Sequence, residues 1–373
     1  MNICAWEQSL SFFGCGMPLG NDPSATARRR LSQSLVYLCR ARERTANELA
    51  CETGIPASCI EEELEMLCRG VNGQYGLLRK NEQGRYIANI IVADREEYET
   101  VRGIYGKYVS TFCDLLQDSL TAGREELCSF WRRNLRGETD LNLLLWALMS
   151  DITGNFITHV GEESAFAFPD AAVCERSFTV AAVADVGDEN CFYSCDSISA
   201  HNVCGYSDIM ARNFHGKRLQ PHFRCGHDLA ADPLLRLIIC CAEGLPLSSL
   251  PGEGQALAYK ALRRGYLRLR QEILEPAVIV LADGISVYIE FQSLLGKLDE
   301  CARETARLLG RELGGVMERY IPSHLRGDYP YYNSCIAANC FTHEVVEECI
   351  GRGLLKEPGK LPGPEGMLMV LCV

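Results

Sequence analysis

The 373-residue sequence lacks several features that define common protein classes. It holds no run of about 18 apolar residues, which a transmembrane helix requires. Its first twenty residues contain no Lys or Arg, whereas a secretory signal peptide begins with a positively charged stretch. The 20 cysteines therefore predict free thiols in a reducing cytoplasm rather than a disulfide framework.

Signature motifs of common enzymes are also missing. The sequence contains no P-loop, no GxSxG nucleophile elbow and no HExxH zinc motif. Gly252 and Gly254 lack the preceding strand and the correctly placed third glycine of a dinucleotide site. These absences predict a protein that is not an enzyme.

Positive charge is scarce, since 37 Lys and Arg oppose 49 Asp and Glu, for a net charge of −12. Such an excess of negative charge argues against general coating of nucleic acid. The charge is uneven, however. Residues 1–110 hold 13 basic and 14 acidic side chains, so their net charge is only −1. A local contact with DNA in this part of the chain remains compatible with the composition.

Residues 28–93 predict a compact unit of three helices followed by a hairpin. Thr45 and Glu48 form a capping-box pattern at the start of the second helix, and Gly54 is a typical C-terminal stop. The hairpin turns at residues 81–84, between two apolar strands. The buried faces of the first and third helices are predicted from apolar residues at helical spacing: Leu31, Leu35, Leu38 and Cys39, then Ile60, Leu64 and Leu67.

This order, with the phrase TANELACETGIPASCIEEELEML, resembles the bacterial winged helix-turn-helix transcription regulators. The longer stretch through GQYGLLRKNEQGRYIANIIVADREEY is also similar to a group of bacterial regulators, some of which carry sigma-factor-like segments. The resemblance implies that the partner is double-stranded DNA. The third helix would enter the major groove and the wing would contact phosphate. The DNA-binding residues that it implies are Arg28, Arg29, Arg30, Arg42, Arg44, Ala57, Ser58, Cys59, Arg79, Lys80 and Arg85.

One property of the third helix favours a different partner. Glu61, Glu62 and Glu65 are predicted to lie on its outer face, where carboxylates repel phosphate. The alternative is therefore a protein-interaction module that docks on RNA polymerase or a sigma-like factor without contacting DNA.

The rest of the chain completes a mixed α+β, helix-rich fold. Residues 1–27 are predicted to form an N-terminal arm and residues 94–157 a helical linker. In that linker, apolar residues from Tyr98 to Leu115 follow a heptad spacing. The spacing is compatible with packing on the same chain or with a homodimer seam.

A second winged-helix-like unit and a C-terminal helix–hairpin are predicted in residues 233–373. In both units, the predicted wing is followed by an apolar strand, the dipeptide Ala-Asp and a long helix. The predicted third helix and wing of this second unit are more basic than those of the first, which favours a DNA contact. The alternative is that these basic residues form a solvated helix face. The basic residues of the second unit are Lys260, Arg263, Arg264, Arg268 and Arg270.

Residues 158–232 predict an α/β module rich in Cys and His. Paired Cys and His at short spacing suit zinc, which prefers a tetrahedral set of these ligands. The candidate ligands are His201, Cys204, His222, Cys225 and His227. Buried thiols with hydrogen-bonded histidines are the alternative, and a metal-dependent enzyme is a second one. The sequence as a whole therefore predicts a cytoplasmic DNA-binding transcription regulator whose central module senses a metal, a ligand or redox state.

Overall fold

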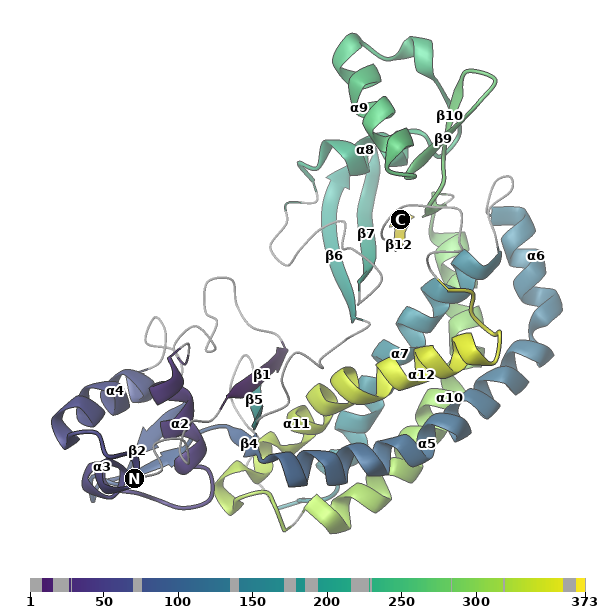
Figure 1. Ribbon diagram of the computed structural model, residues 1–373. Helices are drawn as coiled ribbons and strands as arrows, with labels where there is room; N and C mark the ends of the chain where they lie inside the picture. The colour runs from purple at the N-terminus through teal and green to yellow at the C-terminus, as the bar shows by residue number, and fades with distance from the viewer. Residues whose placement is uncertain are drawn as a thin grey trace. The chain divides into compact units, whose positions relative to one another are not determined.

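The computed structural model is a mixed α/β, helix-rich chain that divides into two compact units (Figure 1). It describes residues 9–15, 27, 29–69, 76–134, 141–170, 179–184, 194–215, 228, 230–282, 284–317, 319–357 and 367–372. The first unit comprises residues 1–108, 157–190 and 306–341, and the second comprises residues 109–156, 191–305 and 342–373. Each unit is thus assembled from three separate stretches of the chain.

The first unit contains a body of three helices and a hairpin, which we call the first helix–hairpin body. Its elements are α2 (Arg30–Leu38), α3 (Ala46–Thr53), α4 (Ala57–Arg69), β2 (Leu78–Lys80) and β3 (Tyr86–Ala88). The capping box predicted at α3 is confirmed, because Thr45 accepts from the Glu48 backbone N–H and the Glu48 carboxylate accepts from the Thr45 N–H. Gly54 ends α3 in the left-handed conformation, at φ +72°.

A three-stranded sheet in the order β1-β5-β4 accompanies this body. Strand β5 (Thr179–Ala184) lies between β4 (Ile91–Ala93), which is parallel to it, and β1 (Leu10–Cys15), which is antiparallel. Apolar residues of the sheet, including Leu10 and Ala182, share one buried core with Leu35 and Leu64 of the body. Residues 10–15 are therefore a strand of the folded unit, and not part of the arm that the sequence predicts.

The second unit contains a body of similar order, which we call the second helix–hairpin body. Its elements are α8 (Pro233–Cys240), a 3-10 turn η3 (Leu247–Ser249), α9 (Gly252–Arg263), β9 (Leu267–Arg270) and β10 (Ile273–Pro276). The short strand β8 (Leu245–Pro246) pairs with β10. Asp232 caps α8 by accepting from the Leu235 N–H, and Pro233 occupies the first helical turn.

The sheet of the second unit repeats the connectivity of the first. Its order is β11-β12-β7-β6, in which β11 (Ile279–Leu281) is parallel to β12 (Met367–Cys372) and β12 is antiparallel to β7 (Tyr206–His215). In both units, the strand that follows the hairpin lies parallel to a strand from much later in the chain. That later strand is antiparallel to one preceding the body. The extra strand β6 (Ser194–Val203) forms a hairpin with β7.

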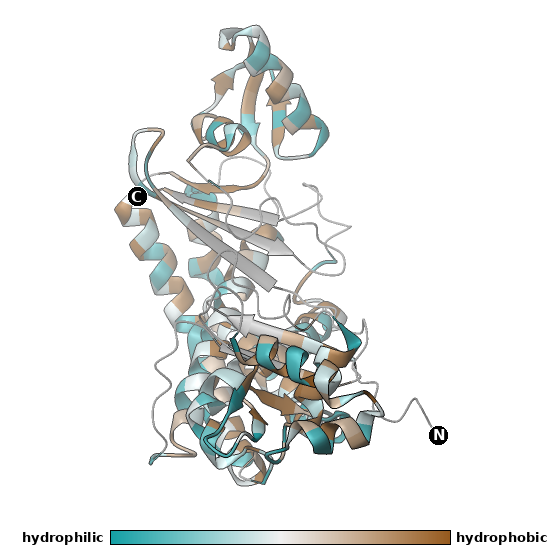
Figure 2. Ribbon diagram, turned by 90° about the vertical axis from the view of Figure 1, so that its left-hand side faces the viewer, coloured by the Kyte–Doolittle hydropathy of each residue, from teal (hydrophilic) through white to brown (hydrophobic). Residues whose placement is uncertain are grey.

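Further helices connect these parts of the chain. They are α5 (Arg95–Ala122), α6 (Arg124–Asn134), α7 (Leu141–Ala165), α10 (Ile285–Met317), α11 (Tyr329–Ile336) and α12 (Thr342–Gly351), with a 3-10 helix η4 (Ser323–Asp328) before α11 and a π-helical turn η5 (Ala337–Phe341) after it. Polar and apolar residues alternate along the helical ribbons (Figure 2), as expected for helices with one buried face. No helix within the described residues is long and apolar enough to cross a membrane.

The heptad seam of α5 is buried within its own chain. Tyr98, Val101 and Phe112 are all at most 4 % exposed. Tyr105 donates from its hydroxyl to the Asn333 carbonyl at 3.2 Å. The seam therefore provides intrachain packing, and its residues are not exposed for the homodimer seam that the spacing alone allows.

Candidate nucleic-acid interface

In the first helix–hairpin body, a turn at Gly54 joins α3 to α4. The predicted stripe of Ile60, Leu64 and Leu67 is fully buried, so the opposite side of α4 faces solvent. The chain just before the hairpin packs closely on α4, because a Cβ at Gly76 would clash with the Cys68 carbonyl oxygen. The body thus exposes α4 and the β2–β3 hairpin while it buries their apolar sides.

Several arginines predicted to bind DNA are engaged in ion pairs within this body. Arg29 pairs with the buried carboxylate of Glu63, and Arg44 pairs with Glu52. Arg85 lies 3.1 Å from Glu48, whose pKa is held below its usual value by hydrogen bonds from Thr45 and by the Arg85 charge. Arg29 thus joins the start of α2 to α4, and Arg85 joins the hairpin to α3. These contacts reduce the availability of the arginines for phosphate.

Other predicted DNA-binding residues are exposed. The cations are Arg30, Arg42, Arg79 and Lys80, and at the start of α4 Ser58 and Cys59 are exposed while Ala57 is half-buried. Lys80 lies 5.1 Å from the centre of the Tyr86 ring, and its hydrogen bond with Tyr86 raises the pKa of its ammonium group. Arg28 lies outside the described residues.

The exposed face of α4 is acidic. Glu61, Glu62 and Glu65 are all exposed, and Arg69 pairs with Glu65 at 2.9 Å. The helix holds four carboxylates and one guanidinium, a net charge of −3. A phosphate backbone that approached α4 would meet these carboxylates, which opposes binding.

The corresponding helix of the second body presents a different face. Tyr259, Lys260 and Arg263 are exposed on α9, whose helical residues include one carboxylate, Glu253. Tyr259 is 50 % exposed, which is unusual for an aromatic ring in a helix of a folded body. Lys260 and Arg263 have no ion-pair partner among the described residues. This face combines two exposed cations with an aromatic ring.

The β9–β10 hairpin continues the exposed side of this body. Arg268 pairs with Glu275 at 3.0 Å across the two strands, and Arg270 is exposed beside the turn. The two turn residues, Gln271 and Glu272, both have positive φ, at 47° and 67°. Positive φ at both central positions is the geometry of a two-residue type I′ turn, which makes the hairpin tight.

The two helices can be compared position by position through their buried residues. Leu64 and Leu67 of α4 have the same three-residue spacing as the buried Ala258 and Ala261 of α9. With these pairs matched, Glu61, Glu62 and Glu65 correspond to Gln255, Ala256 and Tyr259. The outer face of α9 therefore lacks all three of the carboxylates that make α4 acidic.

Sequence patterns predicted the basic residues of α9, but not its exposed aromatic ring. Tyr259 directly follows buried Ala258, so its side chain falls outside the apolar stripe. Its position next to the apolar stripe is the sequence feature that could have predicted its exposure. The ring would be a flat surface against which a sugar or a base can pack.

The metal site predicted in the central module is not assembled in the described part of the chain. His201 pairs with Asp208 across the β6–β7 hairpin, and Cys204 contacts the Arg236 carbonyl oxygen at 3.9 Å. Within the described ranges, no group of three or more His, Cys, Asp or Glu side chains could hold a metal ion. His222, Cys225 and His227 lie outside those ranges.

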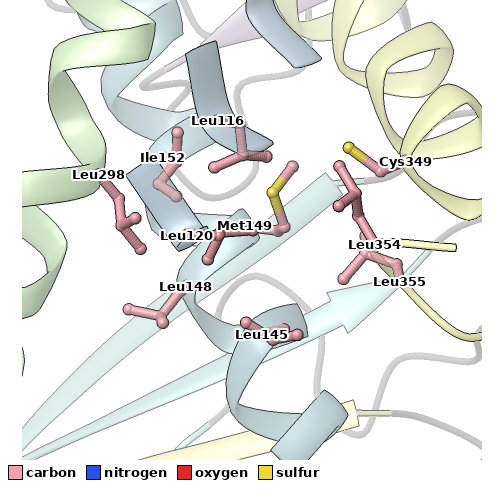
Figure 3. Close-up of a pocket in the computed structure, with 10 residues that line it drawn as sticks. All are labelled: Leu116, Leu120, Leu145, Leu148, Met149, Ile152, Leu298, Cys349, Leu354 and Leu355. Atoms are coloured by element: carbon pink, nitrogen blue, oxygen red, sulfur yellow. The ribbon is translucent and has the colours of Figure 1, made fainter. Parts of the chain in front are cut away.

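A small cavity in the second unit has an entirely apolar lining (Figure 3). Its volume is about 10 Å³, close to the minimum that one water molecule needs. Such a space is a packing gap between helices and leaves no room for an organic ligand. Its lining residues are Leu116, Leu120, Leu145, Leu148, Met149, Ile152, Leu298, Cys349, Leu354 and Leu355.

Comparison with known proteins found no relative of this chain. No family model, curated protein or solved structure matches the chain.

Proposed function

We propose that this protein is a DNA-binding transcription regulator, and that α9 and the β9–β10 hairpin make its principal contact with duplex DNA. Three helical segments followed by a hairpin are the element order of a winged helix-turn-helix, in which the third helix enters the major groove. Both helix–hairpin bodies have this order. Such a regulator would act in the cytoplasm.

The observation that carries the proposal is the outer face of α9. Lys260 and Arg263 are exposed cations on the third helical segment. Exposed Tyr259 directly precedes Lys260 and lies one helical turn before Arg263. Lys and Arg serve both as phosphate contacts and as partners for guanine in the major groove. Arg270 on the hairpin extends the positive surface toward the position of a wing contact.

The proposal is tested by recovering genomic DNA fragments with the purified full-length protein and sequencing them. We expect the parent protein to enrich a defined set of fragments. The double variant Lys260→Glu and Arg263→Glu should enrich none of them. Reversal of two matched cations in the first body, Arg30→Glu and Arg42→Glu, should leave the set unchanged. Equal loss in both variants would assign the effect to net charge alone and contradict the proposal.

The acidic face of α4 favours a second candidate function, docking on RNA polymerase or a sigma-like factor. Glu61, Glu62 and Glu65 would oppose DNA but suit a basic protein surface. A pull-down from lysate, with and without nuclease, distinguishes the two functions. Polymerase subunits that remain bound after nuclease treatment, and are lost in a Glu61→Lys and Glu62→Lys variant, would support docking.

A further inference from the structure

Two cysteines meet where the β6–β7 hairpin lies against α8. Cys204 sits in the turn of the hairpin with a positive φ of 52°, next to Gly205 with φ of 87°. Its sulfur donates toward the Arg236 carbonyl oxygen at 3.9 Å. In an α-helix, that oxygen also accepts from the N–H of the residue four positions later, which is Cys240. The Cys204 sulfur therefore lies beside Cys240.

The neighbouring Cys204 also affects the Cys240 thiol. Burial raises the pKa of the Cys240 thiol, and so do the charge of Cys204 and a hydrogen bond with it. Cys240 is nevertheless exposed as a residue, and Cys204 is half-buried. Solvent and small solutes can therefore reach this pair.

We propose that Cys204 and Cys240 are a reversible oxidation site, at which a peroxide converts the two thiols into a disulfide. The thiolate of one cysteine attacks hydrogen peroxide, so that a sulfur–oxygen bond forms, the oxygen–oxygen bond breaks and hydroxide leaves. The sulfur of the other cysteine then attacks the resulting sulfenic acid, which forms the disulfide and releases the oxygen as water. In total, two thiols lose two electrons and two protons, and peroxide becomes two molecules of water.

The disulfide would join residues of the hairpin and α8, which already share a buried core through Val203 and Leu235. It would pin the first helix of the second helix–hairpin body to the sheet and close a loop of the unfolded chain, which stabilises the folded state. The proposal concerns this chemistry and does not depend on the proposed function.

A second thiol pair provides an internal control. The sulfurs of Cys113 and Cys349 lie 3.7 Å apart, but both residues are buried. Hydrogen bonding with Cys113 and burial raise the pKa of Cys349 far above its usual value. A thiol that remains protonated and shielded from solvent does not react with peroxide at a comparable rate.

The test treats the reduced full-length protein with hydrogen peroxide, blocks the remaining thiols and maps tryptic peptides without reduction. We expect residues 177–212 to be linked to residues 237–260. The link should disappear in Cys204→Ser and in Cys240→Ser. It should persist in Cys241→Ser, in a Cys191→Ser and Cys195→Ser variant, and in a Cys113→Ser and Cys349→Ser variant.

A second measurement tests the site through stability. Oxidation should raise the Tm of the parent by roughly 4–10 °C, and a dithiol reductant should reverse this shift. Absence of the link, or its persistence in Cys240→Ser, would overturn the proposal.

Discussion

The two helix–hairpin bodies have the same element order and sheet connectivity but different outer faces. In the first, exposed carboxylates lie along α4 and three arginines are held in ion pairs. In the second, α9 exposes Tyr259, Lys260 and Arg263. The scaffold fixes which helix is presented, whereas the side chains of its exposed face decide what that helix can bind. The more basic body is therefore the better candidate for DNA, although the first body carries the clearer sequence motif.

The contacts inside the two bodies also differ. The carboxylate of Glu63, only 5 % exposed as a residue, accepts hydrogen bonds from Ser32 of α2 and from Arg29. When the buried residues of the two helices are matched, Leu257 occupies the equivalent position in α9 and packs against the apolar core. At this matched position, the first body has a buried polar contact between its helices and the second has apolar packing.

Truncation of a core side chain should have the largest effect on stability, and it should distinguish the roles of the two bodies in DNA binding. Leu64→Ala and Leu274→Ala each remove a fully buried side chain, so each should cost about 2–5 kcal/mol in the free energy of unfolding. Hydrogen exchange should show lost protection in the altered body. We expect only Leu274→Ala to weaken DNA binding at elevated temperature. Equal weakening by Leu64→Ala would contradict the assignment of binding to the second body.

The buried polar contact of the first body should respond differently to two changes. Ser32→Ala leaves the Glu63 carboxylate short of a hydrogen-bond donor and should cost about 1–3 kcal/mol. Ser32→Ala combined with Glu63→Leu replaces both partners by apolar side chains, as at Leu257 of the second body, and should be neutral or stabilising. Denaturant unfolding measures both. If the double variant proved as costly as Ser32→Ala alone, the polar contact itself would be needed for stability.

Substitutions in the hairpin turn of the second body should increase the stability of the protein. Gln271 and Glu272 both have positive φ, which residues with a Cβ adopt at an energetic cost. Gln271→Asn with Glu272→Gly supplies the residues preferred in a type I′ turn and should stabilise the protein by about 1 kcal/mol. Thermal unfolding checks the change, with Glu253→Gln on α9 as a charge-matched control. A lower Tm in the turn variant would contradict the type I′ assignment.

The smallest expected difference is a pH response in the first unit. His324 contacts the Ala88 carbonyl oxygen at 2.9 Å, and burial lowers the pKa of its imidazole. The neighbouring Arg79 also lowers this pKa, while the Ala88 hydrogen bond, Asp328 and Glu43 raise it. Because the unfolded state takes up the proton first, stability should fall as pH decreases from about 7.5 through the unfolded pKa of about 6.5.

A His324→Gln variant keeps a donor for Ala88 but cannot take up the proton. Its Tm should therefore change less than that of the parent between pH 7.5 and pH 5.5. An identical pH response in the two proteins would show that other groups cause the change.

Local patterns predicted the helices and hairpins well, because their signals lie within a few residues of one another. The capping box at Thr45 and Glu48, the stripe of α4 and the position of α9 are examples. The sheets could not be predicted in this way. Strand β1 pairs with β5, which lies about 170 positions later in the chain, and no local pattern records that partner.

The sequence predicted which residue types the candidate site contains, but not which of those side chains are available to bind a partner. The sequence identifies Arg29, Arg44 and Arg85 as cations, but their carboxylate partners come from other elements that only folding brings near. The Cys204–Cys240 pair has the same origin, since its members lie 36 positions apart. For the same reason, the heptad spacing of α5 could not reveal that its seam is covered by the protein's own helices.

The most direct test of the central claim is the salt dependence of duplex DNA binding by the full-length protein. On one enriched fragment, the parent should bind with an affinity that falls steeply as salt concentration rises. Lys260→Ala with Arg263→Ala should weaken binding by about 10–100-fold and reduce the slope of log K against log salt by roughly 0.9 for each lost phosphate contact. Arg30→Ala with Arg42→Ala should change neither quantity appreciably. Undiminished affinity and slope in the α9 variant would contradict the account.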